Sequence, residues 1–290
     1  MQEAILYQKL PDLKVKCDVC SHRCIIKDGF RGICGVRENQ KGILYALNYG
    51  KTVAAGIDPI EKKPLYHFLP GTLIYSFATV GCNFRCEWCQ NFEIAQGPKP
   101  MKPIQGTEIT PIQHVEKAMK YGCPSIAYTY SEPTIFLEYA LDTMKLAHEN
   151  KLKNVWVTNG FMTKETLDLI LPYLDAANVD YKGPNDGVYE KYCGGTAEPI
   201  MENLKYLKQA GVHLEITTLI VPGVNDKYEQ IEKIAQFIAN EVGVEVPWHI
   251  SRFFPAWKMM DTEITPLRTL KMAKEIGEKA GLRYIHLGNI

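Results

Sequence analysis

The sequence has no surplus of charge of either sign and no long apolar run. Lys plus Arg number 33 and Asp plus Glu number 33, so the formal net charge is zero. Nucleic-acid binding by phosphate neutralisation needs a basic surplus or patch. No apolar run approaches the roughly 20 residues of a membrane span, and Met1–Tyr7 lacks the basic and apolar regions of a secretory signal. We therefore expect a cytoplasmic protein that binds neither nucleic acid nor membrane.

Cysteine is abundant. The chain has nine cysteines, and seven of them fall into two tight clusters. Structural disulfides are rare in the reducing compartment expected of a chain without an export signal. Close spacing there indicates ligands of a metal ion or an iron–sulfur cluster. Cys123 and Cys193 stand alone, and we predict that each is a small buried apolar residue.

The order of apolar segments predicts an α/β fold. The 290 residues suggest about two domains. Beyond residue 70, short apolar runs alternate with stretches of helical period, which indicates βαβ units and a parallel sheet. The expected strands are 73–80, 125–130, 154–159, 177–182, 213–221, 248–254 and 284–287. Helix N-caps are expected at Thr110, Thr163, Asp226 and Thr265.

About six strand–helix repeats predict a partial (β/α)6 TIM-like barrel over residues 71–290, because a complete barrel has eight. A doubly wound sheet is the second possibility. Residues 1–70 are rich in Cys and Gly and do not follow this rhythm, so we expect a small separate module there.

The most specific stretch is residues 81–91, GCNFRCEWCQN, with the spacing C-x3-C-x2-C. Thiolates are the usual ligands of iron–sulfur clusters. Three cysteines on a cuboidal cluster leave one iron without a cysteine ligand, and an open metal position is what reactive chemistry requires. The stretch follows the first expected strand, at the end where barrel enzymes carry their sites. The alternative is a zinc knuckle, whose fourth ligand is not found nearby in the sequence.

This motif, with Trp88 before its last cysteine, resembles the signature of the radical S-adenosylmethionine (SAM) superfamily. The resemblance spans residues 73–287. The N-terminal module, the flanking Gln90-Asn91 and the stretch 58–65, DPIEKKPL, resemble AmmeMemoRadiSam-type proteins, relatives of pyruvate formate-lyase-activating enzymes. Members often continue into a tail with two more C-x2-C pairs, and we infer no function that depends on that tail.

The resemblance implies a 4Fe-4S cluster on Cys82, Cys86 and Cys89. Its unique iron would chelate the amino and carboxylate groups of SAM. An electron from the reduced cluster would then cleave SAM into methionine and a 5′-deoxyadenosyl radical, which abstracts hydrogen from a substrate. The cofactors carry this chemistry, and the protein positions them and excludes water and oxygen.

Polar residues after the second and third expected strands match family segments that contact SAM. Ser131 and Glu132 fit a Gly-Gly-Glu-Pro segment at the methionyl ammonium, although a tyrosine replaces the first glycine. Thr158 and Asn159 fit a Thr-Asn-Gly segment near the ribose and the carboxylate. The structural alternatives are a helix cap at Glu132 and an ordinary turn at Asn159.

Later strands add further candidates. Asp180 and Lys182 resemble an Asp-x-Lys segment whose lysine approaches the SAM carboxylate, although the two could simply pair with each other. His249 matches a histidine near SAM, but a lone histidine can equally be structural. Val157 stands where the activating enzymes have an acid of a monovalent-cation site, so we do not expect that cation site. His67 could face a substrate or fill the junction between the two units.

The first cluster comprises Cys17, Cys20, Cys24 and Cys34, four thiols within 18 residues, with His22 among them. Four ligands complete a structural zinc site or a closed auxiliary 4Fe-4S cluster. The spacing does not decide between these, and metal-free redox-active dithiols are a third possibility.

Three functions follow as hypotheses. The first is a radical SAM enzyme acting on a small molecule or a partner protein, with a reducing partner such as ferredoxin or flavodoxin. The second is an activase that abstracts hydrogen from a glycine of a glycyl-radical enzyme. The third is a non-catalytic iron–sulfur carrier or zinc protein, although carriers normally ligate every iron with protein groups.

Overall fold

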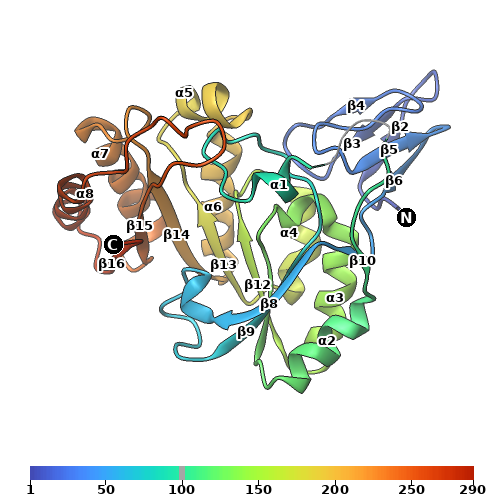
Figure 1. The fold of residues 1–290 in the computed structure, drawn as a ribbon, viewed down its shortest axis with the longest axis horizontal. Coiled ribbons are helices and arrows are strands. Elements are labelled where there is room, and N and C mark those ends of the chain that lie inside the picture. The colour runs from blue at the N-terminus through green and yellow to red at the C-terminus, as the bar shows by residue number, and fades with distance from the viewer. Residues whose placement is uncertain (98–101) are drawn as a thin grey trace.

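The computed structural model describes residues 1–97 and 102–290, and an eight-stranded sheet forms its centre (Figure 1). Seven of the strands are parallel, and each is hydrogen-bonded to the next one along the sheet. These are β9 (Leu73–Ala78), β11 (Ser125–Tyr128), β12 (Lys153–Thr158), β13 (Ala176–Asp180), β14 (His213–Ile220), β15 (Trp248–Arg252) and β16 (Ile285–Gly288). All seven expected strands are confirmed, with ends that shift by one or two residues.

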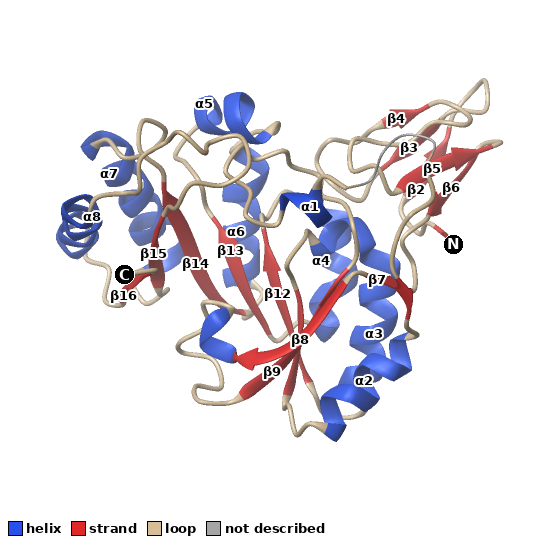
Figure 2. Cartoon of the chain, in the orientation of Figure 1, coloured by secondary structure: helices blue, strands red, loops and turns tan. Residues whose placement is uncertain are grey.

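The longer helices between consecutive strands cover the outer face of the sheet, and two short ones lie at the carboxyl ends of the strands (Figure 2). They are α1 (Phe92–Ala95), α2 (Pro111–Lys120), α3 (Leu137–Glu149), α4 (Lys164–Ile170), α5 (Asp186–Val188), α6 (Glu198–Gln209), α7 (Tyr228–Phe237) and α8 (Leu267–Lys279). Short 3₁₀ turns occupy Ile60–Lys62, Pro133–Phe136 and Leu171–Tyr173, and π turns occupy Tyr189–Cys193 and Ile238–Gly243. The partial barrel is confirmed over the doubly wound alternative, because the strand order follows the chain order without reversal.

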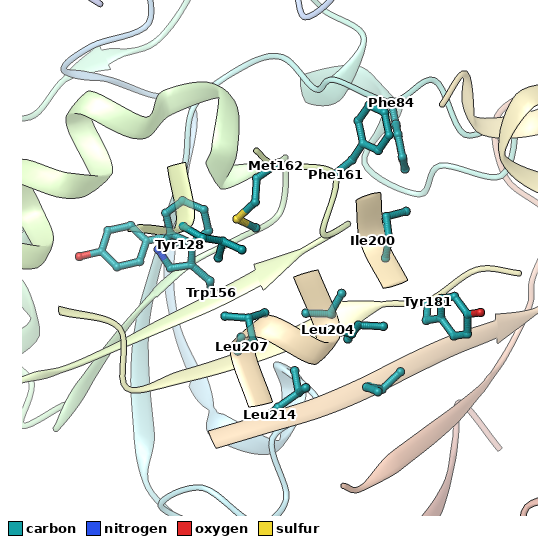
Figure 3. Close-up of a cluster of buried hydrophobic side chains, with 14 of the residues drawn as sticks. Phe84, Tyr128, Trp156, Phe161, Met162, Tyr181, Ile200, Leu204, Leu207 and Leu214 are labelled. Atoms are coloured by element: carbon teal, nitrogen blue, oxygen red, sulfur yellow. The ribbon is translucent and has the colours of Figure 1, made fainter. Parts of the chain in front are cut away.

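The main core lies between the sheet and its helices (Figure 3). On α6, Ile200, Leu204 and Leu207 follow helical spacing and are fully or almost fully buried with Leu214 of β14. Burial of such side chains stabilises the fold by roughly 1.5–3 kcal/mol each. This packing fixes the helices behind the strands and leaves the carboxyl ends of the strands free to carry a site.

Two small antiparallel sheets form most of the N-terminal region. One has the order β1 (Gln2–Glu3), β6 (Ile43–Ala46), β5 (Arg37–Gln40), and the other the order β2 (Tyr7–Lys9), β3 (Val15–Cys17), β4 (Ile25–Ile26). Farther along, β7 (Lys51–Thr52) pairs with β10 (Thr107–Glu108). Within the predicted module 1–70, β8 (Ala54–Pro59) instead pairs antiparallel with β9 and becomes the edge strand of the large sheet. The module boundary at residue 70 stays a prediction.

Residues 60–70, here called the floor segment, cross the amino-terminal ends of the barrel strands. Asn178 of β13 donates to a carbonyl of this segment at 2.7 Å, and Glu215 of β14 accepts two of its backbone N–H groups. His67 Nε2 lies 2.9 Å from His286 Nε2 on β16. His67 is exposed, and both possibilities left open for it stay predictions.

Two of the four expected helix caps are confirmed and two are wrong. Thr110 and Thr163 accept backbone N–H groups at the starts of α2 and α4. Asp226 instead accepts an N–H of the loop before α7. Thr265 donates to a carbonyl of β14, and α8 begins after Pro266 without a side-chain cap. In both wrong cases another partner takes the side-chain oxygen.

Candidate functional site

The cysteine motif forms a loop at the carboxyl end of β9, opposite the floor segment (Figure 2). Two backbone bonds fix this loop to the π turn Tyr189–Cys193: the N–H of Arg85 donates to Cys193 at 2.7 Å, and that of Glu87 donates to Tyr192 at 3.1 Å. Such bonds hold the thiols before any ligand is present, because they order the backbone between them.

A cavity of about 350 Å³ opens at this end of the barrel and brings the predicted residues together. The three motif thiols line it, together with every predicted SAM-contact residue except one. The lining includes Cys82, Cys86, Cys89, Trp88, Ser131, Glu132, Thr158, Asn159, Asp180 and Lys182. A second cavity, of about 520 Å³, lies beside residues 102–107 and contains none of the predicted site residues.

Glu132 is buried at the centre of a hydrogen-bond network. Its Oε1 accepts from the backbone and hydroxyl of Thr134 and from the Thr158 hydroxyl at 2.6 Å. Its Oε2 accepts only the Asn159 N–H, at 2.8 Å. Burial raises the pKa of the Glu132 carboxyl, and these hydrogen bonds oppose the rise. The residue thus caps the turn after it, as the structural alternative held, and still keeps acceptor capacity on Oε2.

Asp180 and Lys182 form the ion pair that the structural alternative predicted, with Nζ 2.8 Å from Oδ2. Lys182 is almost buried while Asp180 is exposed. Burial alone would lower the pKa of Lys182, but the Asp180 carboxylate contributes most to raising it above its ordinary value. An ammonium group has three N–H donors, so this pair leaves Lys182 able to bind a second anionic group in the cavity.

Asn159, directly after β12, connects that strand to the cysteine loop. Its amide nitrogen donates to Asn83 Oδ1 at 2.7 Å, and its side-chain oxygen accepts the N–H of Phe161. Asn83 is buried directly after Cys82, and the sequence analysis did not single it out. Its signal was an amide directly after the first motif cysteine, since an amide that becomes buried needs partners.

A lysine that was not predicted from the sequence also lies in the cavity wall. Lys63 is 4% exposed, pairs with Asp58 at 2.8 Å and lies over the ring of Tyr130. The Tyr130 hydroxyl donates to the same carboxylate at 3.1 Å. Tyr130 has a φ of 60°, unusual for a residue other than glycine, and Asn91 holds its carbonyl. This cluster joins the floor segment to the cysteine loop through one side chain.

His249 is not among the residues that line the cavity. Its Nε2 lies 2.6 Å from Glu215 Oε2. His249 precedes Ser251 by two residues on β15, and Ser251 does line the cavity. Side chains two residues apart on a strand share a face, so His249 occupies the next layer toward the floor segment. Its observed partner is thus a buried carboxylate, in line with the structural alternative.

The arrangement of the motif thiols is compatible with a 4Fe-4S cluster. Within residues 1–97 and 102–290, no group of three or more His, Cys, Asp or Glu side chains lies close enough together to hold a single metal ion. An iron–sulfur cluster contributes its own bridging sulfides and takes about one thiolate per iron, so its ligands share a cavity rather than meet at one point. Three thiols around one cavity fit that requirement. Cys123 and Cys193 are buried as predicted, and the Cys193 thiol also lies within hydrogen-bonding reach of Cys86.

No helix of the described residues combines the length and apolar character needed to cross a membrane.

Residues 77–238 match the family described as Radical SAM superfamily. Uncharacterized protein MJ0808 of Methanocaldococcus jannaschii is 48% identical over 290 residues, 100% of this chain and 86% of that protein. The pyruvate formate-lyase-activating enzyme of Clostridium pasteurianum is 26% identical over 58% of this chain and 72% of that enzyme.

Among solved structures, a radical SAM methyltransferase from Sphaerobacter thermophilus shares the fold. Its TM-score is 0.57 at 14% identity, over 77% of this chain and 68% of that one. The TIM-barrel-like fold, the cysteine motif on one cavity and the matching family profile agree. By its sequence and its fold, the chain belongs to the radical SAM superfamily.

Proposed function

We propose that the chain is a radical SAM enzyme that uses a 4Fe-4S cluster on Cys82, Cys86 and Cys89 and binds SAM in the adjoining cavity. The observation that carries this proposal is the single cavity shared by the three motif thiols and the polar residues at the ends of β11, β12 and β13. A reducing compartment, and ferredoxin or flavodoxin as electron donor, belong to the same proposal.

A bound cluster and SAM would supply one-electron reductive cleavage of the sulfonium and, through it, hydrogen abstraction from a substrate. The residues of this chain would position SAM. Glu132 keeps a free lone pair on Oε2 for an ammonium group, and Lys182 keeps free N–H donors for a carboxylate. These two opposite charges match the two ends of an amino-acid moiety.

The residues around the cavity also limit access of water. Trp88 and Phe84 are 5% and 1% exposed, and Phe84 packs on Phe161 with ring centroids 5.0 Å apart. Exclusion of water strengthens the electrostatic interactions of Glu132 and Lys182 with a ligand, because the local dielectric falls.

The test is reductive SAM cleavage. Protein reconstituted anaerobically with iron and sulfide is given dithionite and SAM, and 5′-deoxyadenosine is quantified. We expect product from the native chain and at least a hundredfold less from the Cys82/Cys86/Cys89→Ala variant. Cys123→Ala, at a buried cysteine outside the cavity, is the matched control and should retain product. A fully loaded native chain that gives no product, and whose paramagnetic signal does not change with SAM, would contradict the proposal.

Activation of a glycyl-radical enzyme is the second candidate. It is supported by the similarity to the activating enzymes of Clostridium pasteurianum and of Escherichia coli, the latter 23% identical over 62% of this chain. It predicts an organic radical, detected by electron paramagnetic resonance, on a glycyl-radical partner mixed with reduced chain and SAM. Product formation without any such radical would favour a small-molecule substrate instead.

A further inference from the structure

The four N-terminal thiols lie around a cavity separate from the one described above. Cys17, Cys20, Cys24 and Cys34 all line it, although they come from a strand, an isolated β-bridge to Met162, a loop and a turn, respectively. Its other walls are mainly aliphatic, apart from the side chain of Arg37. Four cysteines that converge on one apolar space, next to a single cation, need an explanation beyond ordinary packing.

Arg37 supplies the second observation. It is 2% exposed, and its Nη1 and Nη2 donate to the two oxygens of Glu138 at 3.0 and 2.6 Å. Its Nε is buried and has no hydrogen-bond partner among the described residues. An unsatisfied buried donor costs about 1–3 kcal/mol, and natural proteins leave few of them. The Arg37 side chain therefore lacks one acceptor, on the side of the molecule where the thiols lie.

Metal-bound thiolates are acceptors of this kind. N–H donors around a metal site commonly bond to its ligands, and they orient those ligands and tune the metal. A centre with four thiolates also carries net negative charge, which a guanidinium next to it stabilises. Thiolates on a metal would satisfy the Nε–H of Arg37, whereas four neutral thiols are weak acceptors.

We infer that Cys17, Cys20, Cys24 and Cys34 hold a second, tetrathiolate metal centre, with Arg37 as a positioning residue that donates from Nε to one of its sulfurs. The shared chemistry is four thiolates around iron–sulfur or zinc. The cavity has a volume of about 10 Å³, so zinc would require the thiols to close to about 2.3 Å around the ion, whereas a cluster with its own sulfides would require them to move apart.

The position of the centre suggests what it does. Arg37 and Glu138 form a buried pair between the module and α3, and Glu138 also accepts the N–H of Ile5. Beside Cys20, the His22 ring bonds to the carbonyl of Asn83 at 2.8 Å. Asn83 follows Cys82, so the second centre supports the wall of the cofactor cavity. The role of the second centre is structural, and the inference that it exists does not depend on the proposed reaction.

The experiment counts metals in the Cys82/Cys86/Cys89→Ala variant, purified anaerobically and checked for folding by its thermal transition. We expect either four irons with sulfide or one zinc per chain, and the two outcomes distinguish the two kinds of centre. Adding Cys17→Ser and Cys34→Ser should remove that metal. A folded variant with less than about a tenth of an equivalent of both metals would overturn the inference.

Arg37→Lys tests the positioning role while keeping the charge. Loss of the Nε donor should speed release of the second centre's metal to a chelator, by roughly 10–100-fold as for other groups that bond to metal ligands. Arg23→Lys is the matched control, because Arg23 lies in the same module but pairs with Asp18 and Glu165 outside this cavity. Equal release rates for the two variants would remove Arg37 from the inference.

Discussion

At the scale of single residues, Gly195 allows the Phe84 ring of the cysteine loop to pack closely against the backbone after the π turn. A Cβ at this position would lie 2.4 Å from the ring of Phe84, which stands between Cys82 and Cys86. Contacts this short do not occur, so Gly195→Ala must displace the ring. We expect a loss of stability of about 1–3 kcal/mol, as for other overpacked sites. The measurements are the thermal midpoint and the iron bound per chain, both of which should fall.

Gly194→Ala separates backbone strain from crowding. Gly194 has a φ of 80° and open space around its Cβ position. Alanine there should lower stability by about 1 kcal/mol through the backbone alone and leave bound iron unchanged. Full iron content in Gly195→Ala would show that Phe84 does not control the loop.

The predicted site residues were found because parallel strands end at one edge of a sheet, where polar residues after different strands meet. Glu132, Asn159 and Lys182 were predicted because they follow expected strands and resemble family segments that contact SAM, and the three share the cavity. That reasoning did not identify Lys63, which reaches the cavity from the floor segment. The approach of that segment depends on contacts between residues far apart in the chain, and no local pattern encodes them.

At the scale of elements, the start of α2 has the clearest local sequence signal for a helix N-terminus. Thr110 accepts the N–H of Gln113, whose side chain accepts the N–H of Thr110 in return, before a first-turn proline. Thr110→Ala should therefore cost about 1 kcal/mol and lower the thermal midpoint by roughly 2–4 °C. Thr110→Ser keeps the oxygen and should restore most of the loss. Equal midpoints for the native chain and Thr110→Ala would contradict this role.

Caps were predictable only where no N–H from elsewhere in the fold takes the side-chain oxygen. Thr110 and Thr163 bond to their own helices, and both expectations are confirmed. Thr265 has the same local sequence signal, Thr-Pro, as Thr110, but its oxygen accepts the N–H of Phe253 after β15, and its hydroxyl donates to Ile220 of β14. A strand remote in the sequence thus overrides the local preference. Similarly, β8 lacks a long alternating run and becomes an edge strand only because β9 offers it an unpaired edge.

At the scale of the whole molecule, one buried carboxylate connects the floor segment to the strands of the barrel. Glu215 is fully buried and accepts the backbone N–H groups of Tyr66 and His67 in the floor segment. His213 and His249 contact its two oxygens at 3.0 and 2.6 Å. Four donors from three parts of the chain therefore converge on Glu215. The spacing in the sequence, 148 residues between His67 and Glu215, explains why the floor was not foreseen.

This arrangement predicts a loss of stability in acid. Burial alone would raise the pKa of Glu215, but the bonds from His213, His249 and the floor segment outweigh it and lower the pKa from 4.5 to about 2. A carboxyl with a lowered pKa contributes stability that is present above its unfolded-state value and is lost as the pH falls toward its folded-state value. Between about pH 4.5 and pH 2, the free energy of unfolding should fall by on the order of 3 kcal/mol from this group.

Glu215→Gln tests both the pH dependence and the floor. The amide cannot ionise and turns an NH₂ group toward donors, so the variant should be less stable at pH 7 and lose less stability from pH 4.5 to 3. Urea unfolding at these pH values measures both effects. Glu61→Gln removes an exposed carboxyl that accepts the N–H of Gly71 beside the same segment, and it should keep the native pH slope. If Glu215→Gln kept the native slope as well, the acid sensitivity would belong to other carboxyls. Because Lys63 extends from this floor into the cavity, a loosened floor should also weaken the ligand site from below, without any change at the cysteines.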